Sequence, residues 1–193
     1  MVRKLQFVAV DISKYVTKHN ISLFPVWIPR ESKIKADVLS KSPYRDSDDW
    51  QISFDMFNYL NMLWGVCTID RFASCTNTKC ARFNSKIWMT GTENVDSMTI
   101  DWSGEMNWIV PPPTLIPAVI GKMVKEKAKG ILIVPVWKAA AFWPLVVSNH
   151  FVSRTFIFQK CDHVRSGLGS NGIFTNDRFA FQMLACLFGD IDN

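Results

Sequence analysis

The sequence predicts an α/β fold built around a mostly parallel sheet. The first observation is the stretch 108–137, which reads as a strand end, a rigid loop at Pro111–Pro113, an amphipathic helix and a buried strand. The second is the continuous aliphatic run Ile131–Val134, typical of a strand covered on both faces. Together they form a βαβ unit whose loop follows its first strand. Ligands of open parallel sheets bind at that edge.

The other elements are predicted from apolar periodicity and stop signals. In chain order the expected helices are 2–18, 54–64 stopped by Gly65, one from near 115 stopped by Gly130, and 138–147. The expected strands are 20–28, 66–69, an acidic strand edge within 93–102, 131–134 and an edge strand at 155–158. Residues 179–188 form a short apolar helix or strand.

Composition bounds the class of protein. The chain has 193 residues, of which 48% are hydrophobic, so it can build a core. A net charge of +5 permits nucleic-acid binding without establishing it. Five cysteines without metal-ligand spacing indicate reduced thiols, and the apolar run 131–147 is too short and too rich in proline to span a membrane. We expect an intracellular protein, cytoplasmic or nuclear, with no membrane partner.

The N-terminal part carries one specific combination of residues. A Trp27-Ile28-Pro29-Arg30-Glu31 stretch is followed by Ala36-Asp37-Val38-Leu39-Ser40. This resembles the closing segment of the ribonuclease H domain in reverse transcriptases of retrotransposons and retroviruses. The resemblance implies that Asp37 matches the last of four carboxylates that hold two magnesium ions. One carboxylate cannot hold two ions, so we expect no activity from Asp37 here.

A second resemblance begins after the polar segment 42–51. The order of elements from Phe54 onward resembles phage-type adenine-N6 DNA methyltransferases, with Asp70-Arg71-Phe72-Ala73 as the turn after the first strand and Val110-Pro111-Pro112-Pro113 as the later loop. It implies S-adenosylmethionine (AdoMet) as cofactor, Asp70 as the cofactor-side acid, and Pro111 and Pro112 as the rigid loop.

Two substitutions argue against methyl transfer. Val110 stands where the family has Asp or Asn, and Pro113 stands where it has an aromatic ring. Base flipping requires both an acceptor and a stacking platform, so we expect an inactive site unless Asn107 substitutes as the acceptor. Asp96, on the acidic strand edge, is a second candidate for cofactor binding.

The full ordered set of motifs looks like the region downstream of the reverse transcriptase and ribonuclease H in DIRS-type retrotransposon polyproteins. It implies four segments: a truncated ribonuclease H-like end (helix, strand, helix) at 1–45, a linker at 46–52, a degenerate, Rossmann-like, methyltransferase-like domain at 53–160, and a tail at 161–193. The rest of such a polyprotein would be a partner.

Three functions follow. The leading hypothesis is a polyprotein fragment without catalysis or cofactor of its own, structural or binding DNA or RNA. The second is an AdoMet-dependent adenine-N6 DNA methyltransferase with a divergent Pro-Pro loop. The third is a single-strand nucleic-acid module in which lysines meet phosphates and tryptophans stack on bases. Its candidate residues are Lys122, Lys125, Lys127 and Lys129 with Trp108, Trp137 or Trp143.

Overall fold

The computed structural model of the chain describes residues 2–24, 26, 29, 50–166, 174 and 180–189. Contacts divide the chain into two compact units, Met1–Pro43 and Tyr44–Asn193. In the first unit, α1 (Val2–Lys18) confirms the predicted N-terminal helix. Residues 21–24 and 26, predicted to belong to a strand, adopt no regular structure. Asp37 and the rest of the ribonuclease H-like motif lie outside the described residues.

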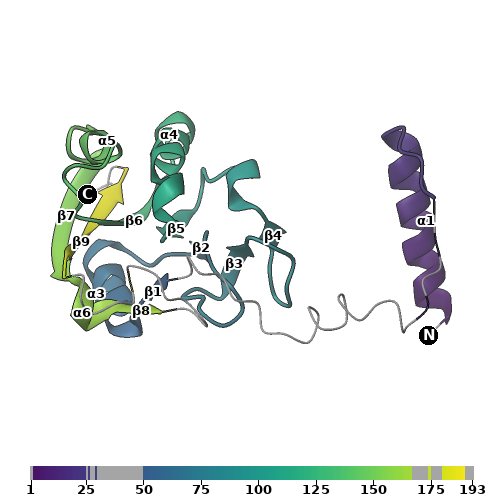
Figure 1. Cartoon of the computed structure of the whole chain (residues 1–193), viewed down its shortest axis with the longest axis horizontal. Coiled ribbons are helices and arrows are strands. Elements are labelled where there is room, and N and C mark those ends of the chain that lie inside the picture. Colours follow the sequence, from purple (N-terminus) through teal and green to yellow (C-terminus); the bar gives the residue numbers. More distant parts are fainter. Residues whose placement is uncertain are drawn as a thin grey trace. The chain divides into compact units, whose positions relative to one another are not determined.

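A seven-stranded sheet forms the centre of the second unit (Figure 1). Its strand order is β4-β3-β2-β5-β6-β9-β7. The strands are β2 (Ile69–Asp70), β3 (Arg82–Ser85), β4 (Asn94–Val95), β5 (Met106–Ile109), β6 (Lys129–Pro135), β7 (Val152–Gln159) and β9 (Gln182–Phe188). Neighbours from β4 to β6 are parallel, whereas β9 runs antiparallel to both β6 and β7. The predicted mostly parallel sheet is therefore present.

The strand order reverses between β2 and β5. From β2 the chain moves outward to β3 and β4, and it then returns to place β5 and β6 on the other side of β2. In open parallel sheets, the crevice beyond the carboxyl ends of the strands at such a switch point is where ligands bind. The fold thus points to the loops after Asp70 and Ile109 as the place for a site.

Helices cover both faces of this sheet. On one face, α3 (Phe54–Trp64) packs its buried residues against Trp108, Ile131 and Ile133. On the other face, α4 (Ile116–Glu126) and α5 (Trp143–Val147) pack against Ile109 and Leu132. Successive strand residues alternate between the two cores because side chains of a strand point to opposite faces. The central strands are buried on both sides, as their aliphatic runs predict.

Two predicted helix ends behave differently. Gly65 ends α3 at φ 105°, a conformation that glycine adopts without strain, as predicted. The prediction that Gly130 stops the next helix is wrong. That helix ends at Glu126, and Lys127 takes the left-handed conformation at φ 50°. Gly130 lies inside β6, where an added Cβ would collide with the Asn107 carbonyl oxygen on β5. A glycine at position 130 therefore allows β5 and β6 to approach closely.

Residues 50–52 and the C-terminal segment contribute more to the second unit than the sequence indicated. β9 lies between β6 and β7, although residues 161–193 were predicted to form a separate tail. β1 (Trp50–Ile52), predicted to be linker, pairs with β8 (Val164–Ser166) in a two-stranded ribbon. The predicted helix 138–147 is reduced to α5. No helix in the described parts of the chain combines the length and apolar character needed to cross a bilayer.

Candidate functional site

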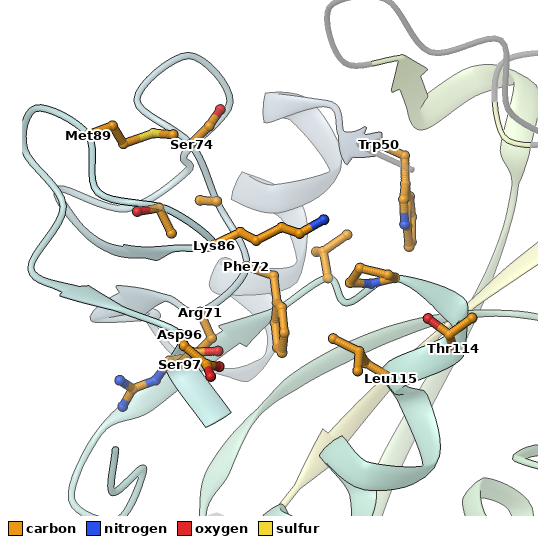
Figure 2. Close-up of a pocket in the computed structure, with 14 residues that line it drawn as sticks. Trp50, Arg71, Phe72, Ser74, Lys86, Met89, Asp96, Ser97, Thr114 and Leu115 are labelled. Atoms are coloured by element: carbon orange, nitrogen blue, oxygen red, sulfur yellow. The ribbon is translucent and has the colours of Figure 1, made fainter. Parts of the chain in front are cut away.

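A cavity of about 470 Å³ opens at the carboxyl edge of the sheet, around the switch point (Figure 2). Loops after four parallel strands line it, and one further side chain comes from β1. The lining residues are Trp50, Arg71, Phe72, Ala73, Ser74, Ser85, Lys86, Met89, Asp96, Ser97, Val110, Pro112, Thr114 and Leu115. The cavity therefore joins the turn after β2 to the proline loop after β5, the two motifs that the sequence singled out.

Asp70 lies at the carboxyl end of β2, as predicted, but its carboxylate serves the loop that follows. It is buried and accepts hydrogen bonds from the backbone N–H groups of Lys79 at 3.0 Å and Phe72 at 3.4 Å. Burial raises the pKa of Asp70 to about 6, against the lowering effect of these two donors. Asp70 fixes the shape of residues 71–79 and is not among the residues that line the cavity.

Arg71, the residue after β2, links this strand to β5 and β3 through its side chain. Its Nε donates to Asn107 Oδ1 on β5 at 2.6 Å, and its Nη1 donates to Asn84 Oδ1 on β3 at 2.9 Å. The guanidinium also lies 5.6 Å from the centre of the Trp102 ring. Burial lowers the pKa of Arg71, yet arginine stays charged at neutral pH. Sequence reasoning assigned no role to this residue.

Asn107, the candidate replacement acceptor, is fully buried. Its Oδ1 accepts from Arg71, and its Nδ2 lies within 3.0 Å of the carbonyl oxygens of Trp102, Glu105 and Lys129. These contacts occupy both the oxygen and the nitrogen of the side-chain amide and fix its position beside β6. Asn107 does not line the cavity, so this arrangement does not support a role as acceptor for a substrate amino group.

The proline loop forms one wall of the cavity. Pro111 is buried behind it, while Val110 and Pro112 line it. The 3-10 helix η3 (Pro113–Leu115) follows directly and leads into α4. Three consecutive prolines fix φ and supply no N–H donors, so this wall is stiff.

One carbonyl of this wall is of particular interest. Alternate carbonyls of β5 point toward β2, because Met106 O accepts from Thr68 N and Trp108 O accepts from Arg71 N. The next carbonyl on that side belongs to Val110. The N–H that would continue the ladder, from Ala73, donates to Asn84 O instead. Within the described ranges no backbone N–H donates to Val110 O, so this carbonyl lies beyond the end of the β2–β5 ladder.

Asp96 lines the opposite side of the cavity, after β4 (Figure 2). It has the left-handed conformation at φ 57° and caps the 3-10 helix η2 (Ser97–Thr99), where its Oδ1 accepts from Met98 N at 3.2 Å. Its Oδ2 has no hydrogen bond within the described part of the chain. Of the two candidate cofactor-binding acids, Asp96 lines the cavity, whereas Asp70, the predicted cofactor-side acid, does not.

The candidate nucleic-acid residues are not gathered at one place. Trp108 is only 1% exposed and packs edge-on against Phe57, so its ring has no free face for a base. Trp137 is half-buried among Phe142, Phe174 and Phe181. α4 runs from the end of β5 back to the start of β6, so its last turn lies at the edge opposite the cavity.

The two lysines of α4 therefore lie away from the site. Lys122 pairs with Glu126 at 2.5 Å and lies 5.3 Å from the Trp102 ring centre. Lys125 is exposed in the last turns of the same helix. Neither residue borders the cavity. A common nucleic-acid surface of Lys122, Lys125, Trp108 and Trp137 is not formed in this arrangement.

Several lining residues were missed by sequence reasoning. Trp50 was placed in a linker, and Lys86 and Met89 lay in a stretch without clear periodicity. Phe72 was noted only as part of a motif. For Lys86, its position just after a strand was a usable signal. For Trp50 there was none, because its place depends on the pairing of β1 with a segment more than 100 residues away.

The fold and the cavity together define the class of protein. A mostly parallel sheet with helices on both faces, with its cavity at the switch point beside a proline loop, is a methyltransferase-like α/β fold. Residues 39–159 match the family described as DNA N-6-adenine-methyltransferase (Dam), and this match includes every residue that lines the cavity. The chain belongs to this family. No curated protein matches the chain.

The family match bears on the other resemblances as well. It covers the segment predicted to be methyltransferase-like and gives no support to a ribonuclease H or DIRS-type polyprotein origin. Asp37 falls outside the described residues, so the predicted magnesium ligand has no geometry to examine. Within the described ranges, no group of three or more His, Cys, Asp or Glu side chains is arranged to hold a metal ion.

Proposed function

We propose that the chain is an AdoMet-dependent methyltransferase that acts on the N6 amino group of adenine in DNA. The observation that carries this proposal is the cavity between the turn after β2 and the proline loop after β5. Its volume of about 470 Å³ falls within the roughly 300–1,000 Å³ of small-molecule sites. Membership of the DNA N-6-adenine-methyltransferase family supplies the chemical class.

The lining residues fit AdoMet in chemical character. Phe72 and Leu115 give an apolar wall for a purine ring, and Asp96 presents an acceptor that suits ribose hydroxyls or an ammonium group. When bound, AdoMet supplies an electrophilic methyl group on a sulfonium. Asp70 acts indirectly in this proposal, because it holds the turn that carries Phe72.

The acceptor for the adenine amino group is the main-chain carbonyl of Val110. Family members with Asp or Asn at this position offer a side-chain oxygen, which valine lacks. The Val110 carbonyl needs no side chain, faces the β2 side and lies beyond the end of the β2–β5 ladder. It would orient the amino group by accepting one of its hydrogens and leave the nitrogen lone pair free to take the methyl group as the sulfur–methyl bond breaks, and the proton lost from the nitrogen would pass to solvent.

A carbonyl acceptor makes this a slow enzyme. Hydrogen bonds to charged groups are about twice as strong as neutral ones. Loss of one positioned transition-state hydrogen bond typically costs about 100- to 1,000-fold in rate. We therefore expect turnover well below that of a member with a carboxylate at this position.

The direct test measures transfer of a labelled methyl group from AdoMet to adenine-containing DNA, with N6-methyladenine identified after hydrolysis. Calorimetry with AdoMet is done in parallel. A dissociation constant in the micromolar range, worth about 8 kcal/mol, is expected. Binding weaker than millimolar, worth less than about 4 kcal/mol, would exclude the proposal.

Val110→Asp tests the acceptor by adding the missing side-chain oxygen. We expect the rate to rise by about 10- to 100-fold, because a charged acceptor binds the amino group more strongly in the transition state. Val110→Leu is the matched control, since it changes size without adding an acceptor. If AdoMet binds to both variants and neither wild type nor Val110→Asp transfers methyl groups, the acceptor assignment is wrong.

A second candidate is a family member that binds DNA without catalysis. Val110 and Pro113, which replace the acceptor and the aromatic residue, are the observations that favour it. DNA binding with no methyl transfer under any of the conditions above would select this function. The origin of the chain in a retrotransposon polyprotein stays a prediction, which no finding supports.

A further inference from the structure

The indole nitrogen of Trp50 is a hydrogen-bond donor without a partner at the cavity wall. Trp50 is 4% exposed, and its Nε1 is one of two buried side-chain polar atoms without a partner in the described part of the chain. One face of the ring stacks on Phe174, with centroids 4.3 Å apart and planes 3° from parallel. The ring is thus held in place while its donor is unused.

Trp102 provides the contrast within the same fold. It is also fully buried, and its Nε1 donates to Ser97 O at 2.8 Å, as a core tryptophan normally does. The other unsatisfied atom, Asn84 Nδ2, belongs to a residue that does not line the cavity. Trp50 is therefore the one described residue that combines a buried, unused donor with a place at the cavity.

Trp50 and Val110 line the same cavity and carry complementary groups. Trp50 brings a donor, and the Val110 carbonyl brings an acceptor. Adenine presents the matching pair along one edge, since its N6 amino group donates and the adjacent ring nitrogen accepts. Guanine presents an acceptor at O6 instead of the amino donor, which would leave the Val110 carbonyl facing another acceptor.

We infer that Trp50 Nε1 donates to a ring nitrogen next to the amino group of the target adenine, and that Trp50 and the Val110 carbonyl together accept this base and reject guanine. The inference rests on the proposed function. It assigns Trp50 a substrate contact that the proline loop itself does not supply. Figure 2 shows the indole at the rim of the cavity and the amino end of Lys86 directed toward it, so a cation lies on the same side.

The test measures methyl transfer by wild type and Trp50→Phe on three substrates. Duplexes carry adenine, 1-deazaadenine or 7-deazaadenine at the target position, opposite an abasic site so that base pairing does not differ. With wild type, we expect one of the two analogues to lower kcat/KM by roughly 10- to 100-fold, the usual effect of an unpaired buried donor. Trp50→Phe keeps an aromatic ring but removes the donor. It should show a similar loss on adenine and no further loss on that analogue.

Trp102→Phe is the matched control. The same change there removes a donor that serves the core, so it should lower the melting temperature while leaving discrimination between adenine and the analogues intact. If Trp50→Phe discriminates between adenine and both analogues as wild type does, or if wild type accepts both analogues fully, the inference is wrong.

Failure of the proposed function is recognised separately. Absence of methyl transfer by wild type contradicts that function, while binding still tests Trp50. Fluorescence anisotropy with the same duplexes and a non-reactive AdoMet analogue gives dissociation constants without turnover. A loss of affinity for one deaza analogue in wild type, absent in Trp50→Phe, supports the contact, and equal patterns in both proteins contradict it.

Discussion

At the scale of single residues, neighbouring residues at the end of β2 have different structural roles. Asp70 is buried beneath the loop and bonds to its backbone, while Arg71 joins β2 to Asn84 and Asn107 on the adjoining strands. Arg71 also lines the cavity, together with Phe72 and the next two residues, whereas Asp70 does not. Asp70, at the end of β2, thus shapes the site indirectly, by holding the backbone of the loop that lines it.

The pH dependence of stability tests the state of Asp70. Its pKa is raised from 3.8 to about 6 by burial, so between about pH 4 and pH 6 the folded chain binds more protons than the unfolded chain at this group. The free energy of unfolding should therefore fall by about 3 kcal/mol as the pH rises through this window, and stay level above it.

Urea denaturation of wild type and Asp70→Asn at pH 4, 5, 6 and 7 measures this contribution. The difference between the two proteins removes the effect of other acids. Examples are Glu93, whose pKa is lowered by Arg82, and Glu105, whose pKa is lowered by the hydrogen bond from Thr68 and then by Arg82. Asp70→Asn should not show this decrease in the free energy of unfolding between about pH 4 and pH 6. Parallel pH curves for the two proteins would show that Asp70 does not titrate in this way.

At the scale of elements, β5 and β6 approach each other closely near their amino-terminal ends. Gly130 on β6 is opposite Asn107 on β5, and a side chain there would meet the Asn107 carbonyl oxygen and its Cβ, the latter at 2.8 Å. The same contact lets the Asn107 amide reach the carbonyl of Lys129 at 2.7 Å. The element pair therefore holds Asn107, and through it Arg71, in place.

Gly130→Ala should disturb this pair. Because the clash is with backbone, we expect a loss of stability of about 2–4 kcal/mol, at the upper end of ordinary point mutations. Gly121→Ala is the control: it lies in α4 with open space around it, and alanine there should stabilise the helix by up to about 1 kcal/mol. Thermal denaturation of both variants tests this. A neutral Gly130→Ala would contradict the close-contact argument.

At the scale of the whole chain, the second unit is completed by its C-terminal strand. β9 pairs with β6 on one side and β7 on the other, and six of its seven residues are buried. β1 and β8 likewise bring Trp50 to the cavity from far along the sequence. A domain limited to residues 53–160, as predicted from the sequence, would leave out β1, β8 and β9.

Truncated chains test whether the folded unit ends at residue 160, as predicted from the sequence, or includes β9. A chain of residues 44–193 should fold with the melting transition of the second unit and bind AdoMet as the full chain does, because it keeps both cores and the cavity. A chain ending at residue 160 should fail to fold, since β6 and β7 would each lose a neighbour. Circular dichroism and calorimetry measure this, and a cooperative transition in the shorter chain would contradict the role of β9.

Much of the fold was accessible from local sequence patterns. The aliphatic run at Ile131–Val134, the amphipathic helix before it and Gly65 after α3 are signals with a period or a stop residue, and each element formed where it was expected. The failures share a cause. Gly130, Asn107 and Trp50 take their roles from contacts with distant segments, which periodicity does not register.

The sequence by itself determined that the chain forms a parallel α/β sheet with a proline loop at its carboxyl edge, because these features follow from short-range hydrophobic order and from the fixed φ of proline. Only the tertiary structure decided which polar groups face the cavity. The burial of Asp70 and Asn107, and the lack of a partner for Trp50 Nε1 in the described part of the chain, arise because folding brings distant segments together, which satisfies some buried polar atoms and not others.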